Sequence, residues 1–288
     1  MSVSSEVPAT FRSSAVQPGA AALVRNGLGE VLSRRRLISY LVRADIKKKG
    51  SDTLLGNVWW VFDPLLQMLV YVVLVSVIFT RSTPDYPLFI FAAILPWKWF
   101  TTAVNDGVTA VTGMERLIKQ INFPKLVLPV AAVMAGVVNF AFGLIPLTAL
   151  LVLFYLHRAS PWILALPLIA GVQLLFSLPV AIALSAVNVF YRDVGNLMRH
   201  LLRIWFYLSP GLYAFDLINR ISEKSHLAGR ILELNPFATL FTAYRNVIYD
   251  QHAPDWSALG QLALVSLLLL AVAVFLFKRV EPSFAKVL

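Results

Sequence analysis

The residues best suited to bind a ligand form a dense basic run near the start of the chain. Apolar residues recur at helical spacing between positions 24 and 50. The basic residues between them are Arg34, Arg35, Arg36, Arg43, Lys47, Lys48 and Lys49. A basic amphipathic helix typically lies in the interface of a membrane, where each basic group near anionic headgroups gains about 1 kcal/mol. We therefore predict an amphipathic interface helix over residues 23–50; a soluble basic helix is the alternative.

Two acidic residues, Asp63 and Asp106, stand inside apolar segments. An ionised side chain at bilayer depth costs about 2.5–3.5 kcal/mol on insertion scales, so it usually faces a cavity or a partner. Asp106 is therefore a candidate to line a channel or to pair with a basic residue, although a position near the inner interface would also explain it. For Asp63, the neighbouring Trp59 and Trp60 favour a position near the membrane surface.

Aromatic residues are numerous, with 7 Trp, 9 Tyr and 19 Phe. Trp97 and Trp99 could stack on sugar rings, although anchoring in an interfacial belt is the simpler explanation for any single Trp. Tyr207 and Tyr213 flank the sequence Ser209-Pro210-Gly211. These two tyrosines are the better candidates to line a channel.

Common catalytic and nucleotide-binding motifs are absent from the sequence. It contains no G-x-x-x-x-G-K-[ST] loop for nucleotide phosphates and no G-x-G-x-x-G, and no G-x-S-x-G. It has 0 Cys, and its four His never have the close spacing of a zinc pair. We therefore expect no catalytic site, no metal and no cofactor on this chain.

These residues must be positioned by an all-α membrane protein. Hydrophobic residues make up 58% of the 288 and charged residues only 14%, whereas soluble domains have roughly 25% charged residues. This composition excludes an ordinary soluble enzyme and a disordered chain. A transmembrane helix takes about 20 residues. Six apolar segments qualify, at about 57–80, 88–111, 126–156, 161–190, 198–218 and 257–277. The fifth is the weakest, because Arg199, His200 and Arg203 stand at its start and Pro210-Gly211 interrupts it.

The distribution of basic residues predicts the orientation. The formal net charge is +10, which by itself could indicate nucleic-acid binding. Most of the 25 Lys and Arg, however, fall on one side of the six spans, as the positive-inside rule requires of cytoplasmic segments. We predict that both termini are cytoplasmic and that nucleic acid is not a partner. The outer interface would then be marked by Trp97, Trp99, Trp162 and Trp256.

The stretch at 227–250 is too charged for one span and too short for two. Asn235-Pro236 divides it into two short helical pieces, which we predict to form a re-entrant external hairpin bordering a channel; a loop on the outer surface is the alternative. The remaining divisions are a flexible cytoplasmic tail at 1–22, a six-span domain at 51–280 and a cytoplasmic C-terminus at 281–288.

Several segments resemble one family of membrane proteins in their order and spacing. They are KKKGSDTLLGNVWWVF, PLFIFAAILPWKWF, LIKQINFPKLVLPV, NVFYRDVGNLMRHLLRIWFYLSPGLY and LNPFATLFTAYRNVIY. Together they resemble ABC-2 type permeases of the group that exports lipid-linked polysaccharides: O antigens, teichoic acids, capsules and mycobacterial galactan. The resemblance covers roughly residues 34–280.

The resemblance implies a subunit of an inner-membrane ABC transporter. In that family two permeases form the channel as a homodimer, and each binds a separate cytoplasmic ATPase, which holds ATP and Mg. The loop at 113–124 matches the coupling helix that docks on the ATPase. The residues implied there are Glu115, Arg116, Leu117, Ile118 and Lys119.

The same resemblance suggests roles for other residues. The basic run would meet membrane lipids and the pyrophosphate of a polyprenyl-linked polysaccharide, with Arg43 and Lys47 as the main candidates. The hairpin resembles external gate helices, and the residues implied there are Asn235, Pro236, Tyr244 and Arg245. Tyr191–Asp193 resembles a family F-R-D element, where Arg192 and Asp193 are expected to form a structural ion pair.

Two alternatives remain at this stage. The first is an ABC-2 exporter of a drug or small lipid, which has the same fold and another cargo. The second is an intramembrane enzyme or an ATP-independent channel, although the absence of catalytic motifs leads us to expect that the chain is not an enzyme.

Overall fold

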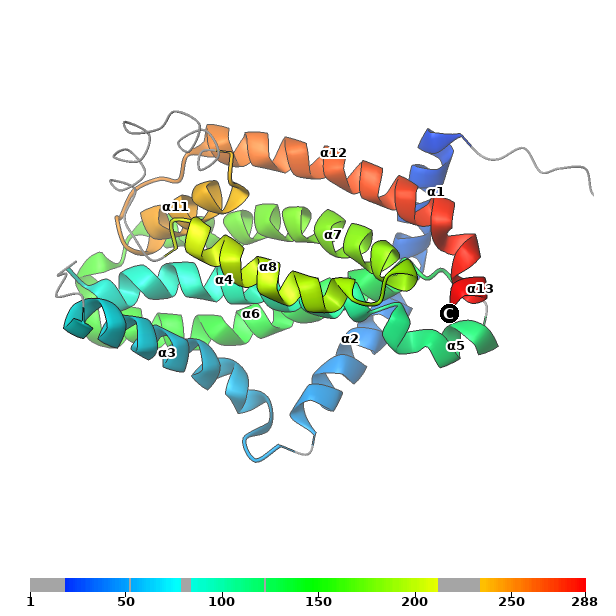
Figure 1. Ribbon diagram of the computed structural model, residues 1–288. Coiled ribbons are helices and arrows are strands. Elements are labelled where there is room, and N and C mark those ends of the chain that lie inside the picture. Colours follow the sequence, from blue (N-terminus) through cyan, green and yellow to red (C-terminus); the bar gives the residue numbers. More distant parts are fainter. Residues whose placement is uncertain (1–18, 52, 79–83, 122, 212–233) are drawn as a thin grey trace, which may run out of the picture.

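The computed structural model describes residues 19–51, 53–78, 84–121, 123–211 and 234–288. Within these ranges the chain is helical and contains no strand, and the longest helices lie side by side (Figure 1). The helices are α1 (Ala20–Ser33), α2 (Arg35–Gly50), α3 (Trp59–Val72), α4 (Tyr86–Thr109), α5 (Glu115–Gln120), α6 (Val127–Phe154), α7 (Leu166–Phe190), α8 (Val194–Leu208), α11 (Pro236–Ile248), α12 (Trp256–Val280) and α13 (Phe284–Val287). Short 3₁₀ or π-helical pieces join them: η1 (Gly56–Val58), η2 (Val73–Ile78), η3 (Thr112–Met114), η4 (Leu156–Arg158), η5 (Pro161–Ala165) and η6 (Glu281–Ser283).

Five helical stretches of the described chain are long and apolar enough to cross a membrane. They are Gly56–Val75, Tyr86–Thr109, Val127–Phe154, Pro161–Phe190 and Trp256–Val287. These helices confirm the prediction of an all-α membrane protein. The remaining predicted span, at 198–218, corresponds to α8, which has 15 residues and ends at Leu208; residues 212–218 lie outside the described ranges.

Helix α4 forms the centre of the bundle. In its most apolar stretch 78% of the residues are buried, against 6% in the stretch that contains α3. Lipid gives helices no hydrophobic driving force to associate, so their association depends on van der Waals packing. Small residues at helix contacts let the two backbones approach closely. Gly107 of α4 is such a residue, since a Cβ added to it would lie 2.6 Å from the Cβ of Ala181 in α7.

Aromatic rings fill the space between α4 and its neighbours. The ring of Trp97 lies 4.6 Å from that of Phe237 in α11 and 6.1 Å from that of Trp205 in α8. Trp99 stacks on Phe140 of α6 at 4.7 Å. The prediction that Trp97 and Trp99 mark the outer interface therefore needs correction. Both are near the middle of α4 and almost fully buried, because their rings pack the bundle instead of reaching its end.

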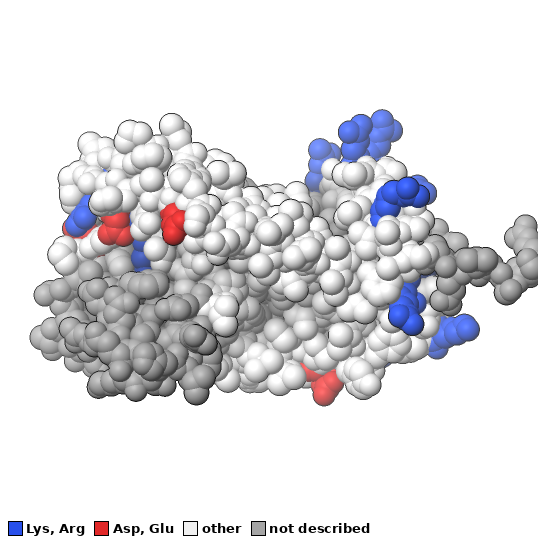
Figure 2. Space-filling model, turned by 90° about the horizontal axis from the view of Figure 1, so that it is seen from above, with Lys and Arg blue, Asp and Glu red and all other residues white. Residues whose placement is uncertain are grey.

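One end of the bundle carries α1, α2, α5 and α13, and we call it the basic end. Figure 2 shows Lys and Arg gathered there. The single interface helix predicted over 23–50 is in fact two helices, which meet at Arg34, where the backbone leaves helical geometry (φ −97°, ψ 22°). Helix α1 packs on α12, where Lys278 pairs with Glu30 at 2.7 Å. The predicted tail at 1–22 falls mostly outside the described residues, and α1 already begins at Ala20.

The close approach of α4 and α7 gives a direct test of the packing. Gly107→Ala should destabilise the protein by about 1–3 kcal/mol, because Ala181 meets the new methyl group with its own Cβ and backbone Cα and cannot rotate away. Gly171→Ala is the matched control, since nothing lies within 4 Å of its added Cβ. Thermal unfolding in detergent measures both. Equal midpoints for the two variants would contradict the packing described here.

Candidate functional site

A groove lined by polar and aromatic side chains runs between α3, α4 and α8, with a volume of about 420 Å³. We call it the polar groove. Its lining residues are Gln67 and Tyr71 of α3, Trp97, Lys98, Thr101, Thr102 and Asn105 of α4, and Arg199, Leu202, Arg203, Phe206 and Tyr207 of α8. The structure therefore brings together two residues predicted to line a channel, Trp97 and Tyr207.

The sequence of α8 explains why this helix supplies the basic groups of the groove. Arg199, Arg203 and Tyr207 follow one another at four-residue intervals, so they lie on one face of the helix. Leu202 and Phe206 are buried and pack α8 against the bundle. Arg203 lies about 13 Å along the helix from Val194, which is well inside a bilayer if α8 starts at its surface.

The groove combines the chemical groups that a charged, hydroxyl-rich ligand would need. Lys98 pairs with Asp63 of α3, and Arg199 donates to Asn196. Arg203 is exposed and has no ion-pair partner among the described residues. Guanidinium groups bind anionic oxygens in a fork, and the hydroxyl, amide and aromatic groups nearby suit sugars.

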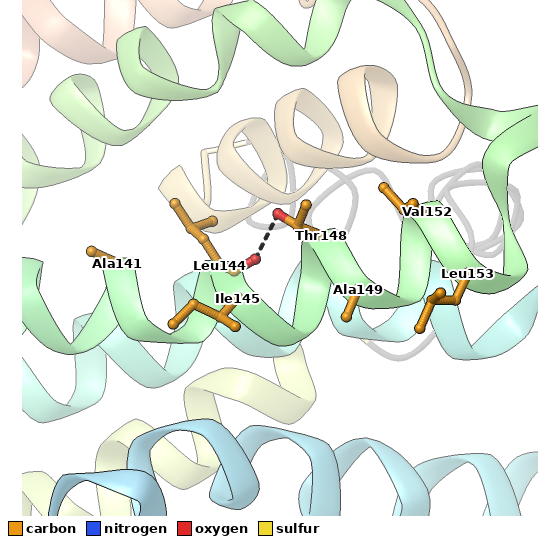
Figure 3. A pocket seen from close by; sticks show the side chains of 7 residues that line it. All are labelled: Ala141, Leu144, Ile145, Thr148, Ala149, Val152 and Leu153. Carbon is orange, nitrogen blue, oxygen red and sulfur yellow. Dashed lines mark hydrogen bonds between the residues drawn. The ribbon is translucent and has the colours of Figure 1, made fainter.

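A second hollow, on α6, has a different character (Figure 3). It has a volume of about 590 Å³ and is lined by Ala141, Leu144, Ile145, Thr148, Ala149, Val152 and Leu153. Its hydroxyl, on Thr148, donates to the carbonyl of Leu144 at 2.8 Å. The surface is therefore apolar and suits lipid chains, so we take the polar groove as the candidate functional site.

Asp106, also predicted to line a channel, lies in a different place. It is not in the polar groove, and it accepts a hydrogen bond from Lys49 of α2 at 2.7 Å. Lys49 also pairs with Asp45 at 2.7 Å, in a cleft of about 460 Å³ between α2, α4 and α6. Burial opposes the charge of Lys49, but the two carboxylates outweigh it and raise its pKa. These contacts hold α2 against the basic end of α4.

The basic residues predicted to meet lipid headgroups all remain exposed. They are Arg34, Arg35, Arg36, Arg43 and Lys47. None of them lines the polar groove. This placement leaves them available to a membrane surface or to a ligand outside the bundle.

The predicted coupling loop contains the short helix α5. Ile118 is buried in the core of the basic end, together with Phe277 and Phe284. Glu115 binds Lys119 at 2.7 Å, and Arg116 is exposed. Leu117 is half-buried. Arg192 lies 3.7 Å from Glu115; the predicted ion pair of Arg192 with Asp193 does not form.

Asn235 and Pro236 begin α11 and join it to α8. The Asn235 Oδ1 accepts from the backbone N–H of Phe237 and from the Trp205 Nε1, both at 3.0 Å. The Asn235 Nδ2 donates to the Ser209 hydroxyl at 2.8 Å. This is the usual chemistry of an N-cap followed by a proline in the first turn. The first half of the predicted hairpin, up to residue 233, lies outside the described residues, as does Tyr213.

Arg245 of α11 is buried where this helix packs against the rest of the bundle. Its Nη1 donates to the carbonyl of Pro210 at 2.6 Å, its Nη2 donates to the carbonyl of Gly211, and its guanidinium lies 3.8 Å from the centre of the Phe89 ring. Tyr244 is completely buried. Within the single chain, neither residue lines the groove; instead, Arg245 supports the backbone that follows α8.

A polar network fastens the other side of α11. The Asp85 carboxylate accepts from Arg158 at 2.8 Å and from His157 at 3.0 Å. The Tyr249 hydroxyl donates to the carbonyl of Pro84 at 2.6 Å, and Arg158 stacks over the Tyr249 ring at 4.5 Å. The hydrogen bond from His157 and the charge and hydrogen bond of Arg158 lower the pKa of Asp85.

Sequence reasoning missed most of the groove. Gln67, Thr101 and Thr102 carry no motif, and Arg199 and Arg203 counted only as features that weaken a predicted span. The signal that would have found the two arginines is the repeat of polar residues at four-residue spacing in 194–208, which predicts a helix with one polar face.

The chain is similar to known proteins over most of its length. It is 34% identical over 257 residues to the O-antigen export system permease protein RfbA of Myxococcus xanthus, covering 89% of this chain and 97% of that protein. It is 25% identical over 252 residues to an O-antigen export system permease protein RfbA of Klebsiella pneumoniae, covering 88% and 95%. No family model matches the chain.

The junction of α8 and α11 can be tested by mutation. Asn235→Ala should lose about 1–2 kcal/mol of stability, because the helix loses its cap and the Trp205 N–H loses its acceptor. Asp255→Ala removes a simple cap, that of α12, and is the control. Thermal unfolding compares the two. If Asn235→Ala were no more destabilising than Asp255→Ala, the junction would have no role beyond capping.

The Asp85 network predicts a pH dependence. A carboxylate with a lowered pKa stabilises the fold above its ordinary pKa of about 4, and this contribution is lost as the pH falls through the lowered value. Asp85→Asn should therefore cost about 1 kcal/mol at neutral pH, and the difference from the wild type should shrink in acid. Unfolding midpoints between neutral and acid pH test this; a constant difference would exclude the charge as its cause.

Proposed function

The chain belongs to the family of O-antigen export system permeases, and we propose that it exports a polyprenyl-pyrophosphate-linked polysaccharide, driven by a separate ATP-binding subunit. The observation that carries this proposal beyond the family name is the polar groove. It places Arg199 and Arg203 beside Trp97 and Tyr207 on helices of a membrane bundle. Such a surface fits a polymer of sugars that ends in a diphosphate.

The charges of the groove support a homodimer. Facing lipid, Arg199 and Arg203 would each cost about 2.5–3.5 kcal/mol or more. In a single chain the groove lies open between α3 and α8, and α3 is the least buried of the candidate spans. A second copy placed against these helices would close two grooves into one water-filled channel. A channel suits a long polymer, which cannot be enclosed at a single midplane site.

The basic end is proposed to face the cytoplasm, with both termini there, since cytoplasmic segments are rich in Lys and Arg. The ATP-binding subunits would dock on α5 at this end, where Met114, Arg116 and Ile121 are exposed. Because the sequence lacks a P-loop, ATP and Mg would bind to those subunits, and this chain would need no cofactor or metal and would catalyse no reaction.

The exposed basic residues of α2 are proposed to guide the lipid-linked substrate. Arg43 and Lys47 are exposed on α2, from which they would meet the diphosphate before it enters the channel. At the opposite end, α11 is proposed to act as an external gate. Asn235 and Arg245 hold it against the end of α8, so the gate and the groove share one support.

The polar groove can be tested in cells. A strain that lacks the gene should accumulate the lipid-linked polymer inside and lose it from the surface. The wild-type gene should restore export, whereas the double variant Arg199→Gln, Arg203→Gln should export at least about tenfold less, because charge-assisted hydrogen bonds to the substrate are lost. Surface polymer, intracellular lipid-linked polymer and the amount of permease in the membrane are measured together.

Arg279→Gln is the matched control. It makes one substitution of the same kind, at an exposed position of α12 that does not line the groove, so export should match the wild type. Normal surface polymer in the deletion strain would refute polysaccharide export as the function. Normal export by the double variant would refute the role of the groove and leave the family assignment intact.

A further inference from the structure

A buried asparagine connects the segment before α5 to the start of α8. Asn188, near the end of α7, is 3% exposed. Its Nδ2 donates to the hydroxyl of Thr112 in η3 at 3.2 Å. Its Oδ1 accepts from the backbone N–H of Gly195 in α8 at 3.2 Å. One side chain thus links η3 to the junction of α7 and α8, which lies 76 residues further along the chain.

The neighbours of this amide determine its orientation. The backbone N–H of Gly195 can only donate, so the atom that faces it must be the carbonyl oxygen of Asn188, and the NH₂ group then faces Thr112. Gly195 lies in the first turn of α8, where backbone N–H groups have no partner within the helix. The side chain of Asn188 therefore acts as a cap for α8 supplied by another helix.

Other contacts that reach α5 are less able to move α8. Arg192 lies 3.7 Å from Glu115, but its side chain is 67% exposed, and exposed ion pairs contribute little. Lys119 donates to the carbonyl of Leu288 at 2.6 Å, which connects α5 to the C-terminal segment and not to the groove. Asn188, by contrast, is only 3% exposed, and hydrogen bonds in the protein interior are stronger than those in water.

Movement at Gly195 would reach the basic groups of the polar groove directly. Arg199 follows Gly195 by about one helical turn, and Arg203 follows Arg199 by another. No loop separates these positions, since all three lie in α8. A shift of the first turn of α8 therefore shifts both arginines.

We propose that Asn188 is a positioning residue that transmits movements of the η3–α5 segment to α8 and thereby adjusts the polar groove. The inference rests on the proposed function, because it requires an ATP-binding subunit that engages α5. Asn188 touches neither ATP nor the polymer; it acts through Thr112 and Gly195.

The test is hydrogen–deuterium exchange on the complex of the permease with its ATP-binding subunit, with ADP and with a non-hydrolysable ATP analogue. Thr112→Val removes the hydroxyl with little change of shape and leaves the bond from Asn188 to Gly195 in place. Thr112→Ser keeps the hydroxyl and serves as the rescue variant. Thr109→Val is the matched control, because the Thr109 hydroxyl donates to carbonyls of its own helix.

In the wild-type complex, replacing ADP by the ATP analogue should change the hydrogen–deuterium exchange rates of both α5 and α8. Thr112→Val should reduce this nucleotide-dependent change in the exchange rates of α8 at least about threefold, because one hydrogen bond is lost. The change in the exchange rates of α5 should remain as in the wild type. Asn188→Ala should give the same loss in α8. Thr112→Ser and Thr109→Val should behave like the wild type. In vesicles, the complex with Thr112→Val should also hydrolyse more ATP per polymer exported than the wild-type complex.

Two results would overturn the role of Asn188 alone. One is a full response of α8 in Thr112→Val; the other is a wild-type complex in which α5 responds to the nucleotide and α8 does not. A wild-type complex in which α5 itself fails to respond would contradict the proposed engagement of α5, and the role of Asn188 would be refuted with it.

Discussion

A charged side chain between apolar helices costs about 2.5–3.5 kcal/mol even on insertion scales, and the described structure relieves this cost in three ways. Lys49 and Asp106 form an ion pair between α2 and α4. Arg245 donates to backbone carbonyls at the end of α8. Arg199 and Arg203 face an open groove. The first two arrangements hold helices together, and only the third leaves charge available to a ligand. The same constraint therefore separates the charges that join helices from those that a ligand can reach.

The central position of α4 makes the groove and the proposed gate parts of one packed unit. Trp97 lines the groove and also packs on Phe237 of α11 and Trp205 of α8. Asn235 accepts from the same Trp205. Because cores transmit displacement and leave few voids, a shift of α11 would change the wall of the groove. Trp97, which the sequence assigned to a membrane belt, is therefore better understood as packing between α4, α8 and α11.

The sequence predicted what depends on composition and failed where a contact depends on distant residues. Long apolar runs have few structural alternatives, so the five described spans agree with prediction. The partner of Asp106 is Lys49, 57 residues away along the chain, and no local pattern could identify it. Trp97 was misplaced because a belt and a buried core both favour tryptophan. The break between α1 and α2 at Arg34 could not be predicted, because no glycine or proline stands there.

Helix α8 shows why average hydropathy is a poor guide to a helix with one polar face. Arg199 and Arg203 lower the apolar character of the segment, so by that measure it was the weakest of the predicted spans. The same two residues, read by their spacing, predict one polar face on a helix that packs on the bundle through Leu202 and Phe206. Any helix that lines a water-filled channel must keep such a face, because one of its sides meets water and the other meets protein. In a bundle of this kind, the span with the weakest hydropathy is therefore the first place to look for the channel.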